Sequence, residues 1–143
     1  MTDAASETLS VVVERDFPFP PEKIWRALTQ PHLIEAWLMK NDFSPVVGHR
    51  FNLRGDWGGV LDCEVLEVEP NRTLAYTWDH IHEDPAFNLK SVVTFTLEPT
   101  AAGARLRMEQ SGFRPGQKQA LGGARHGWNQ MFGTLEQVLA GEG

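Results

Sequence analysis

PGQKQALGGARHGWNQMFGTLEQVLA, residues 115–140, is the one long helical pattern in the chain. Its apolar residues recur three and four positions apart, which is the spacing of one face of an α-helix. These residues are Leu121, Ala124, Trp128, Met131, Phe132, Leu135, Val138 and Leu139. Because most of the remaining chain predicts β-strands, we expect this helix to bury its apolar face against a sheet.

Four glycines interrupt the same helical pattern, at Gly122, Gly123, Gly127 and Gly133. Each costs about 1 kcal/mol of helix stability relative to alanine. One interpretation is that the helix backbone packs closely on the sheet at these positions. The other is that the first half of the helix can shift over a cavity. The sequence leaves both interpretations open.

The composition predicts a single domain. The chain has 143 residues, of which 41% are hydrophobic, so it is long enough and apolar enough for one core. We expect a domain over residues 9–143 behind a flexible N-terminus, residues 1–8. The net charge of −6 and the absence of a Lys/Arg cluster argue against non-specific binding of nucleic acid.

The sequence also indicates where the protein works. Residues 1–10 are polar and lack the basic and apolar regions of a signal peptide, and no apolar run is long enough for membrane insertion. The one cysteine, Cys63, excludes an internal disulfide and fits a reducing compartment, so we expect a cytoplasmic protein. In its strand context, Cys63 is expected to be a small packing residue.

Two short helices and a series of strands precede the long helix. Alternating apolar residues predict a strand over 9–17, and Pro21 and Pro31 delimit helices over 22–29 and 32–38. Further strands are expected at 43–46, 49–54, 60–69, 73–79, 89–98 and 104–111, joined by turns typical of antiparallel pairs. The short helices after the first strand are not a crossover to a parallel strand.

One hairpin register decides which residues of strand 60–69 face the core. A three-residue loop at 70–72 pairs Val68 with Leu74, Leu66 with Tyr76, and Glu64 with Trp78. A two-residue loop would mix apolar and polar residues on both faces, so the three-residue loop is favoured. In that register, Glu64 shares a face with Leu66 and Trp78.

Five segments together resemble a known superfamily. They are RDFPFPPEKIWRALTQPHLIEAWL (15–38), VVGHRFNLRG (46–55), VLEVEPNRTLAYTW (65–78), VVTFTLEPTAAGARLRMEQSGF (92–113) and HGWNQMFGTLEQVL (126–139). The chain resembles the START-like superfamily, also called SRPBCC, which contains lipid-transfer domains, birch-pollen-type allergens and polyketide cyclases. Within it, the chain is most similar to the branch named for activator homologues of the heat-shock-protein-90 ATPase.

The resemblance implies an α+β helix-grip fold, in which a curved antiparallel sheet of about six or seven strands wraps around the C-terminal helix. It also implies a cavity between the sheet and that helix, which would bind a small hydrophobic or aromatic molecule. The ligand-binding residues expected on this basis are Trp25, Trp37, Phe51, Leu53, Glu64, Leu66, Tyr76, Trp78, Phe95, Met108, Trp128 and Phe132, with Val11 and Val13 also facing inward. The alternative is that these aromatic side chains simply fill the space.

Two other functions stay open, and both would make different demands on the structure. An enzyme of the polyketide-cyclase type would need an inward carboxylate, and Glu64 is the candidate because burial would raise its pKa into a useful range. A bulge in the strand would instead turn Glu64 to solvent. A chaperone-interacting module would need a large exposed apolar patch.

Metal and cofactor sites are not expected. His80 and His82 have the spacing of one strand face, but no third ligand of fixed spacing accompanies them, so a solvated loop is favoured. RGDWGG, residues 54–59, lacks the spacing and the following helix of a phosphate-binding loop. We therefore expect no cofactor, a small apolar molecule as the partner, and a monomer or weak homodimer.

Overall fold

The computed structural model describes residues 9–55, 59–80 and 88–141. These residues form a seven-stranded sheet in the order β1-β7-β6-β5-β4-β3-β2, in which every neighbouring pair is antiparallel. The strands are β1 (Leu9–Phe17), β2 (Lys40–Asn41), β3 (Arg50–Arg54), β4 (Val60–Glu69), β5 (Thr73–His80), β6 (Leu89–Pro99) and β7 (Ala104–Phe113). The helices are α1 (Pro21–Thr29), α2 (Pro31–Trp37) and α3 (Lys118–Gly141).

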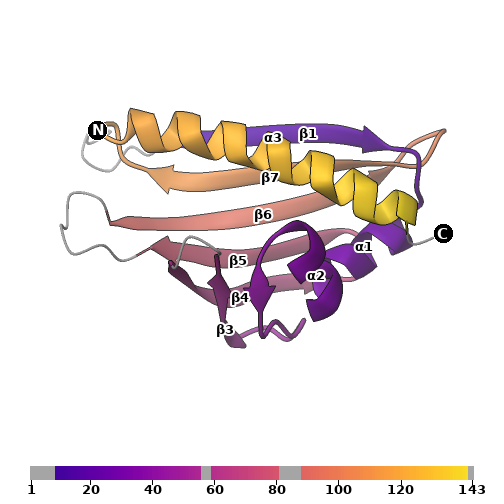
Figure 1. Cartoon of the computed structure of the whole chain (residues 1–143), viewed down its shortest axis with the longest axis horizontal. Helices are drawn as coiled ribbons and strands as arrows, with labels where there is room; N and C mark the ends of the chain where they lie inside the picture. The colour runs from indigo at the N-terminus through magenta and orange to yellow at the C-terminus, as the bar shows by residue number, and fades with distance from the viewer. Residues whose placement is uncertain (1–8, 56–58, 81–87, 142–143) are drawn as a thin grey trace.

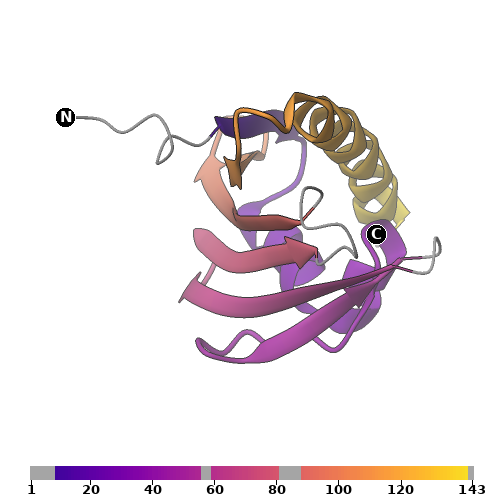
Figure 2. The same cartoon turned by 90° about the vertical axis from the view of Figure 1, so that its left-hand side faces the viewer.

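The sheet is strongly curved, and all three helices lie on its concave side (Figures 1 and 2). The long helix α3 runs beside β1 and β7, while α1 and α2 cover the end of the sheet where α3 terminates (Figure 1). The four fully buried side chains of α3 are Trp128, Phe132, Leu135 and Leu139, which confirms the predicted apolar face. The α+β architecture expected from the sequence is therefore confirmed.

The two short helices are held as one unit. Gln30 ends α1 and begins α2, because its N–H donates to the Arg26 carbonyl at 2.9 Å and its carbonyl accepts from the Ile34 N–H at 2.9 Å. Pro21 and Pro31 occupy the first turns of the two helices, where a missing N–H is tolerated. The buried indole of Trp37 then donates to the Ala27 carbonyl at 2.8 Å, which ties α2 to α1.

The prediction of a strand at 43–46 is wrong. The strand that pairs with β3 is instead β2, in which Lys40 lies opposite Arg54 and Asn41 opposite Leu53. The side chain of Asn41 ends β2 by accepting from the Phe43 N–H at 3.1 Å, an Asx turn that bends the chain away. Phe43 is nevertheless buried, because its ring packs edge-on against Phe51 with centroids 5.1 Å apart.

The β4–β5 hairpin follows the predicted register only near its turn. Val68 pairs with Leu74 and Glu69 with Thr73, and Asn71 takes the left-handed conformation at φ 65° that a three-residue loop uses. A bulge at Leu66 then shifts the register, so that Val65 instead of Leu66 lies opposite Tyr76. Leu66 is 44% exposed, and the expectation that it faces the core is wrong.

Candidate ligand-binding groove

Glu64 lies on the convex face of the sheet, and the prediction that it faces the interior is wrong. The bulge at Leu66 places Thr77, not Trp78, across from Glu64, whose N–H donates to the Thr77 hydroxyl at 2.8 Å. The Glu64 carboxylate pairs with the Arg50 guanidinium at 3.5 Å, and both side chains are substantially exposed. The enzyme hypothesis therefore loses the inward carboxylate on which it depended.

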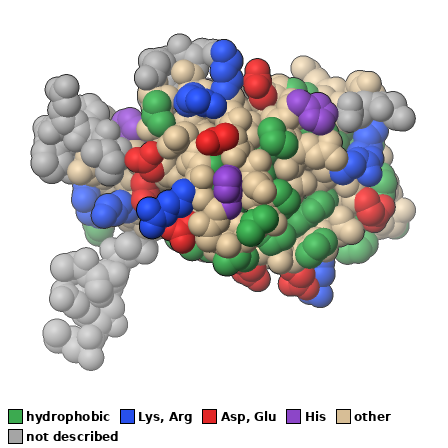
Figure 3. All heavy atoms as spheres, turned by 90° about the horizontal axis from the view of Figure 1, so that it is seen from below, with side chains coloured by type: hydrophobic (Ala, Val, Ile, Leu, Met, Phe, Trp, Pro, Cys, Tyr) green, Lys and Arg blue, Asp and Glu red, His purple; other side chains and the backbone are tan. Residues whose placement is uncertain are grey.

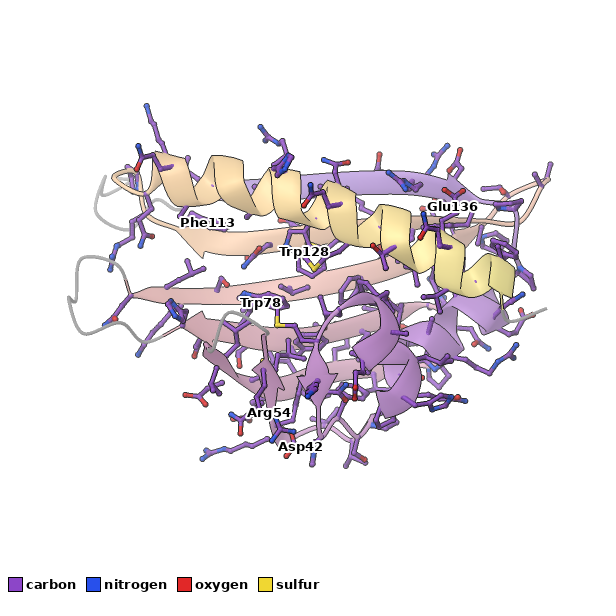
Figure 4. All side chains as sticks on the ribbon, viewed as in Figure 1. Asp42, Arg54, Trp78, Phe113, Trp128 and Glu136 are labelled. Carbon is purple, nitrogen blue, oxygen red and sulfur yellow. The ribbon has the colours of Figure 1, made fainter. Side chains whose placement is uncertain are left out.

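Apart from Leu66, the other residues predicted to face inward are in the core or packed against it. Trp37, Phe51, Leu53, Tyr76, Trp78, Phe95, Met108, Trp128 and Phe132 are buried, as are Val11 and Val13, and Trp25 is half-buried against them. Figure 4 shows Trp78 and Trp128 side by side beneath α3, and their ring centroids are 5.1 Å apart. The Trp128 ring also contacts Phe95 and Phe132, at 5.7 and 6.1 Å. These rings pack against one another between the second half of α3 and the sheet.

A buried chain of hydrogen bonds fixes the position of Trp128. Its indole N–H donates to Gln110 Oε1 at 2.9 Å, and Gln110 Nε2 donates to the Ser91 hydroxyl at 3.0 Å. Ser91 in turn donates to the Trp78 carbonyl at 2.7 Å. Because Gln110 and Ser91 are almost fully buried, each lost partner would leave a polar atom desolvated and unpaired. The sequence did not reveal this series of hydrogen bonds, because polar residues on the inward face of a strand look like interruptions of its apolar pattern.

The side chains of Tyr76 and Cys63 are titratable and buried in the core, and burial favours the neutral form of each. Burial raises the pKa of the Tyr76 hydroxyl well above its ordinary value. Burial also raises the pKa of the Cys63 thiol, and the negative charges of Asp79, Asp62 and Asp42 raise it further. A thiol with a raised pKa is a weak nucleophile, so Cys63 has the packing role that the sequence predicts.

A groove of about 580 Å³ opens beside the aromatic core, between α3 and the α2–β2 connection. Its lining residues in the described part of the chain are Leu38, Met39, Gly55, Gly127, Gln130, Met131 and Thr134. Leu38 and Met39 connect α2 to β2, Gly55 follows β3, and the other four share one face of α3. The apolar side chains of this groove are half-buried, which leaves apolar surface available to a ligand.

A second hollow of about 220 Å³ adjoins the groove. Leu38, Met39 and Gly55 line both spaces, and the second hollow adds Glu35, Lys40 and Arg54. We call this second hollow the charged end of the groove, because the residues that it adds are all charged. Figure 4 shows Arg54 on the β3 side of the molecule, away from Glu136 and Phe113 on the α3 side.

The glycines of α3 have different surroundings, and Gly127 is the one that lines the groove. A Cβ atom added at Gly122, Gly123 or Gly127 would meet nothing within 4 Å, so close packing on the sheet is not the reason for these three glycines. Gly133 differs, because an added Cβ would lie 3.6 Å from Arg15 Nη1. The Arg15 guanidinium lies beside α3 at this point, and its Nη1 is 3.7 Å from Glu136 Oε1.

Sequence reasoning missed this groove. None of the twelve predicted ligand-binding residues is among its described lining residues. The available signal was on α3, where Gly127, Met131 and Thr134 repeat at helical spacing beside the buried face. The contribution of Leu38, Met39 and Gly55 depends on how the α2–β2 connection folds back, which no local pattern reveals.

The described residues give no support to a metal site. In residues 9–55, 59–80 and 88–141, no three His, Cys, Asp or Glu side chains gather as metal ligands would. His80 is the last residue of β5, whereas His82 lies outside the described residues. Within the same ranges, no helix has the length and apolar character needed to cross a bilayer.

A sequence profile described as "Activator of Hsp90 ATPase homolog 1-like protein" matches residues 18–140. The chain belongs to this family. Protein MLL2253 from Mesorhizobium loti, solved by X-ray crystallography, is 70% identical to this chain and superimposes with a TM-score of 0.90. That match covers 92% of this chain and 97% of the other. No curated protein matches the chain.

More distant solved structures share the fold of this family member. CalU16 from Micromonospora echinospora is 23% identical, with a TM-score of 0.78, over 99% of this chain and 83% of that chain. DynU16, described as a putative protein in the dynemicin biosynthetic locus, is 24% identical with a TM-score of 0.78, over 93% of this chain and 47% of that chain. These two likenesses support the helix-grip fold and carry no functional assignment.

Proposed function

We propose that this member of the Hsp90 ATPase activator-like family binds a small, mainly apolar molecule in the groove between α3 and the α2–β2 connection. The observation that carries the proposal is the groove itself, whose volume of about 580 Å³ is in the range of small-molecule sites. Leu38, Met39 and Met131 supply its apolar surface. Methionine side chains adapt their shape to irregular ligands, so two of them suit a binding site.

The polar groups of the groove lie on α3. Gln130 and Thr134 are exposed on the same helical face as Met131, and the Gln130 side chain offers both a donor and an acceptor. A few polar groups at the rim of an apolar surface are typical of sites that orient a ligand. We therefore expect the ligand to place its apolar part against Met39 and Met131.

Binding without catalysis is favoured over the polyketide-cyclase alternative. The carboxylate assigned to that reaction, Glu64, pairs with Arg50 on the convex face, away from the groove. The interior groups Tyr76 and Cys63 have raised pKa values, so neither is ready to transfer a proton near neutral pH. Passive binding requires only the groove.

Two leucine substitutions on α3 test the proposal. Gly127 lines the groove, and its substitution Gly127→Leu places a side chain in that space without a clash at Cβ. Gly123→Leu is the matched control, because it makes the same change on the same helix at an exposed position with no neighbour within 4 Å. Nile red, a neutral apolar dye, is the probe, and its fluorescence rises in an apolar site.

We expect the native protein and Gly123→Leu to bind Nile red equally well. Gly127→Leu should weaken binding by about tenfold or more, because a filled groove removes more than ~1.4 kcal/mol of binding free energy. Both variants should keep the native circular-dichroism spectrum. Equal binding by all three proteins, or no binding by the native protein, would contradict the proposal.

A further inference from the structure

The charged end of the groove contains two positive charges side by side. In the β2–β3 pair, Lys40 lies directly opposite Arg54, and both side chains line the second hollow. Residues opposite each other in an antiparallel pair have Cα atoms about 4.5–5.5 Å apart. Like charges in that position destabilise a sheet, so this pair has a cost that the fold alone does not explain.

Several arginines in or next to the strands have ion-pair partners, whereas the described residues provide none for Arg54. Arg50 pairs with Glu64, Arg72 with Glu69, Arg105 with Asp16, and Arg107 with Glu14 and Glu109. Within residues 9–55, 59–80 and 88–141, neither Lys40 nor Arg54 has a carboxylate oxygen within 4.0 Å of its charged nitrogens. Basic side chains form small groups on the face that Figure 3 shows.

Glu35 is the acidic residue that lines the same hollow. Among the described lining residues of the hollow, this one negative charge accompanies two positive charges. This arrangement suits a group with one negative charge better than a phosphate dianion, which Glu35 would repel. A guanidinium also matches the planar geometry of a carboxylate, to which it donates two parallel hydrogen bonds.

We propose that Lys40 and Arg54 bind the carboxylate of an amphipathic ligand whose apolar part occupies the neighbouring groove. The two spaces share Leu38, Met39 and Gly55 as lining residues and therefore lie next to each other, so the proposed ligand would extend over both. This inference rests on the proposed function and names the ligand class, an apolar monocarboxylate. The bound carboxylate would also relieve the repulsion between the two cations.

Three probes with one apolar body and different head groups test the inference. They are 2-naphthoate, 2-naphthalenemethanol and 2-naphthylmethylammonium, which are negative, neutral and positive near neutral pH. Their affinities are measured by isothermal titration calorimetry with the native chain, Arg54→Gln and Lys40→Gln. The matched control is Arg50→Gln, which removes a charge from the same strand but lines neither the groove nor the second hollow.

The native protein should bind 2-naphthoate about tenfold tighter than the alcohol, and the ammonium compound more weakly than both. Arg54→Gln should bring the affinity for 2-naphthoate close to that for the alcohol, and Lys40→Gln should reduce the preference part-way. The alcohol should bind all variants alike. Because the preference is electrostatic and near the surface, it should also shrink as salt is added.

The outcomes separate this inference from the proposed function. Equal affinity of the native protein for the acid and the alcohol, with Nile red still bound in the groove, would overturn only the carboxylate site. A preference that survives in both Arg54→Gln and Lys40→Gln would also overturn it, because the carboxylate would then bind elsewhere. Failure of all naphthalene probes and of Nile red would overturn the groove as a binding site and this inference with it.

Discussion

The two halves of α3 have the same backbone but different surroundings. The second half contains all four of its fully buried side chains, Trp128, Phe132, Leu135 and Leu139. The first half has no fully buried side chain, and three of its positions are glycines with open space where a Cβ would be. The second half of the helix is therefore fixed by packing along one face, whereas the first half has open space around its glycines. The groove lies beside the packed face and is lined on α3 by Gly127, Gln130, Met131 and Thr134. At Gly127 the absence of a side chain leaves space in the groove, because an added Cβ would meet nothing within 4 Å.

This difference also divides the helix energetically. Packing of an apolar face supplies most of the stability of helices in proteins, so the second half of α3 should open only when the core unfolds. The first half has half-buried Leu121 and Ala124 as its contacts with the core. The first half should therefore fray more readily than the second half.

The largest expected contrast comes from truncating one apolar residue in each half. Trp128 is 1% exposed and contacts three aromatic rings, so Trp128→Ala should reduce the free energy of unfolding by about 3–5 kcal/mol. Leu121 is only half-buried, and Leu121→Ala should cost about 1 kcal/mol. Urea denaturation of both variants measures the two losses. Equal losses would mean that the halves are not packed differently.

The sequence predicted the architecture well because the fold depends on simple periodic patterns. The face of α3 that contains Trp128 and the alternation in β6 and β7 both appear directly in the sequence. The position of Glu64 could not be predicted, because the bulge at Leu66 has no glycine or proline to mark it. A single extra residue there exchanges the two faces of the strand beyond it.

The groove could not be predicted for a different reason. Its residues come from α3 and from the chain around Leu38, Met39 and Gly55, which become neighbours only in the folded protein. The aromatic residues chosen from the sequence are the best candidates for any apolar interior. Because large rings pack well against one another, the same property that suggests a lined cavity also allows a filled one.

The packing of the aromatic core can be tested by raising the pH. Tyr76 is the one tyrosine in the chain, so the absorbance of its phenolate reports on the aromatic core alone. Burial raises its pKa in the folded protein, whereas the unfolded chain releases this proton near pH ~10. The contribution of Tyr76 to stability is therefore intact below about pH 10 and falls as the pH rises further, since only the unfolded state ionises freely.

We expect the phenolate signal to appear together with unfolding and not before it. Cys63 acts in the same direction, because its folded pKa is raised as well. Tyr76→Phe removes only the tyrosine contribution and should move the alkaline unfolding midpoint to higher pH. A phenolate signal that develops while the near-ultraviolet circular dichroism remains native would show that the core around Tyr76 admits water.

The smallest effect tests the open half of the helix. Gly123→Ala should raise the free energy of unfolding by about 0.5–1 kcal/mol, because alanine is the better helix residue and its Cβ meets nothing within 4 Å. Gly127→Ala should give a similar gain but also weaken Nile red binding, because its methyl group enters the groove. Gly103→Ala is the contrasting control, since its Cβ would overlap the Phe17 carbonyl oxygen and must destabilise the protein. If Gly123→Ala also destabilised the protein, the first half of α3 would be packed against a neighbour, and the difference between the two halves would be lost.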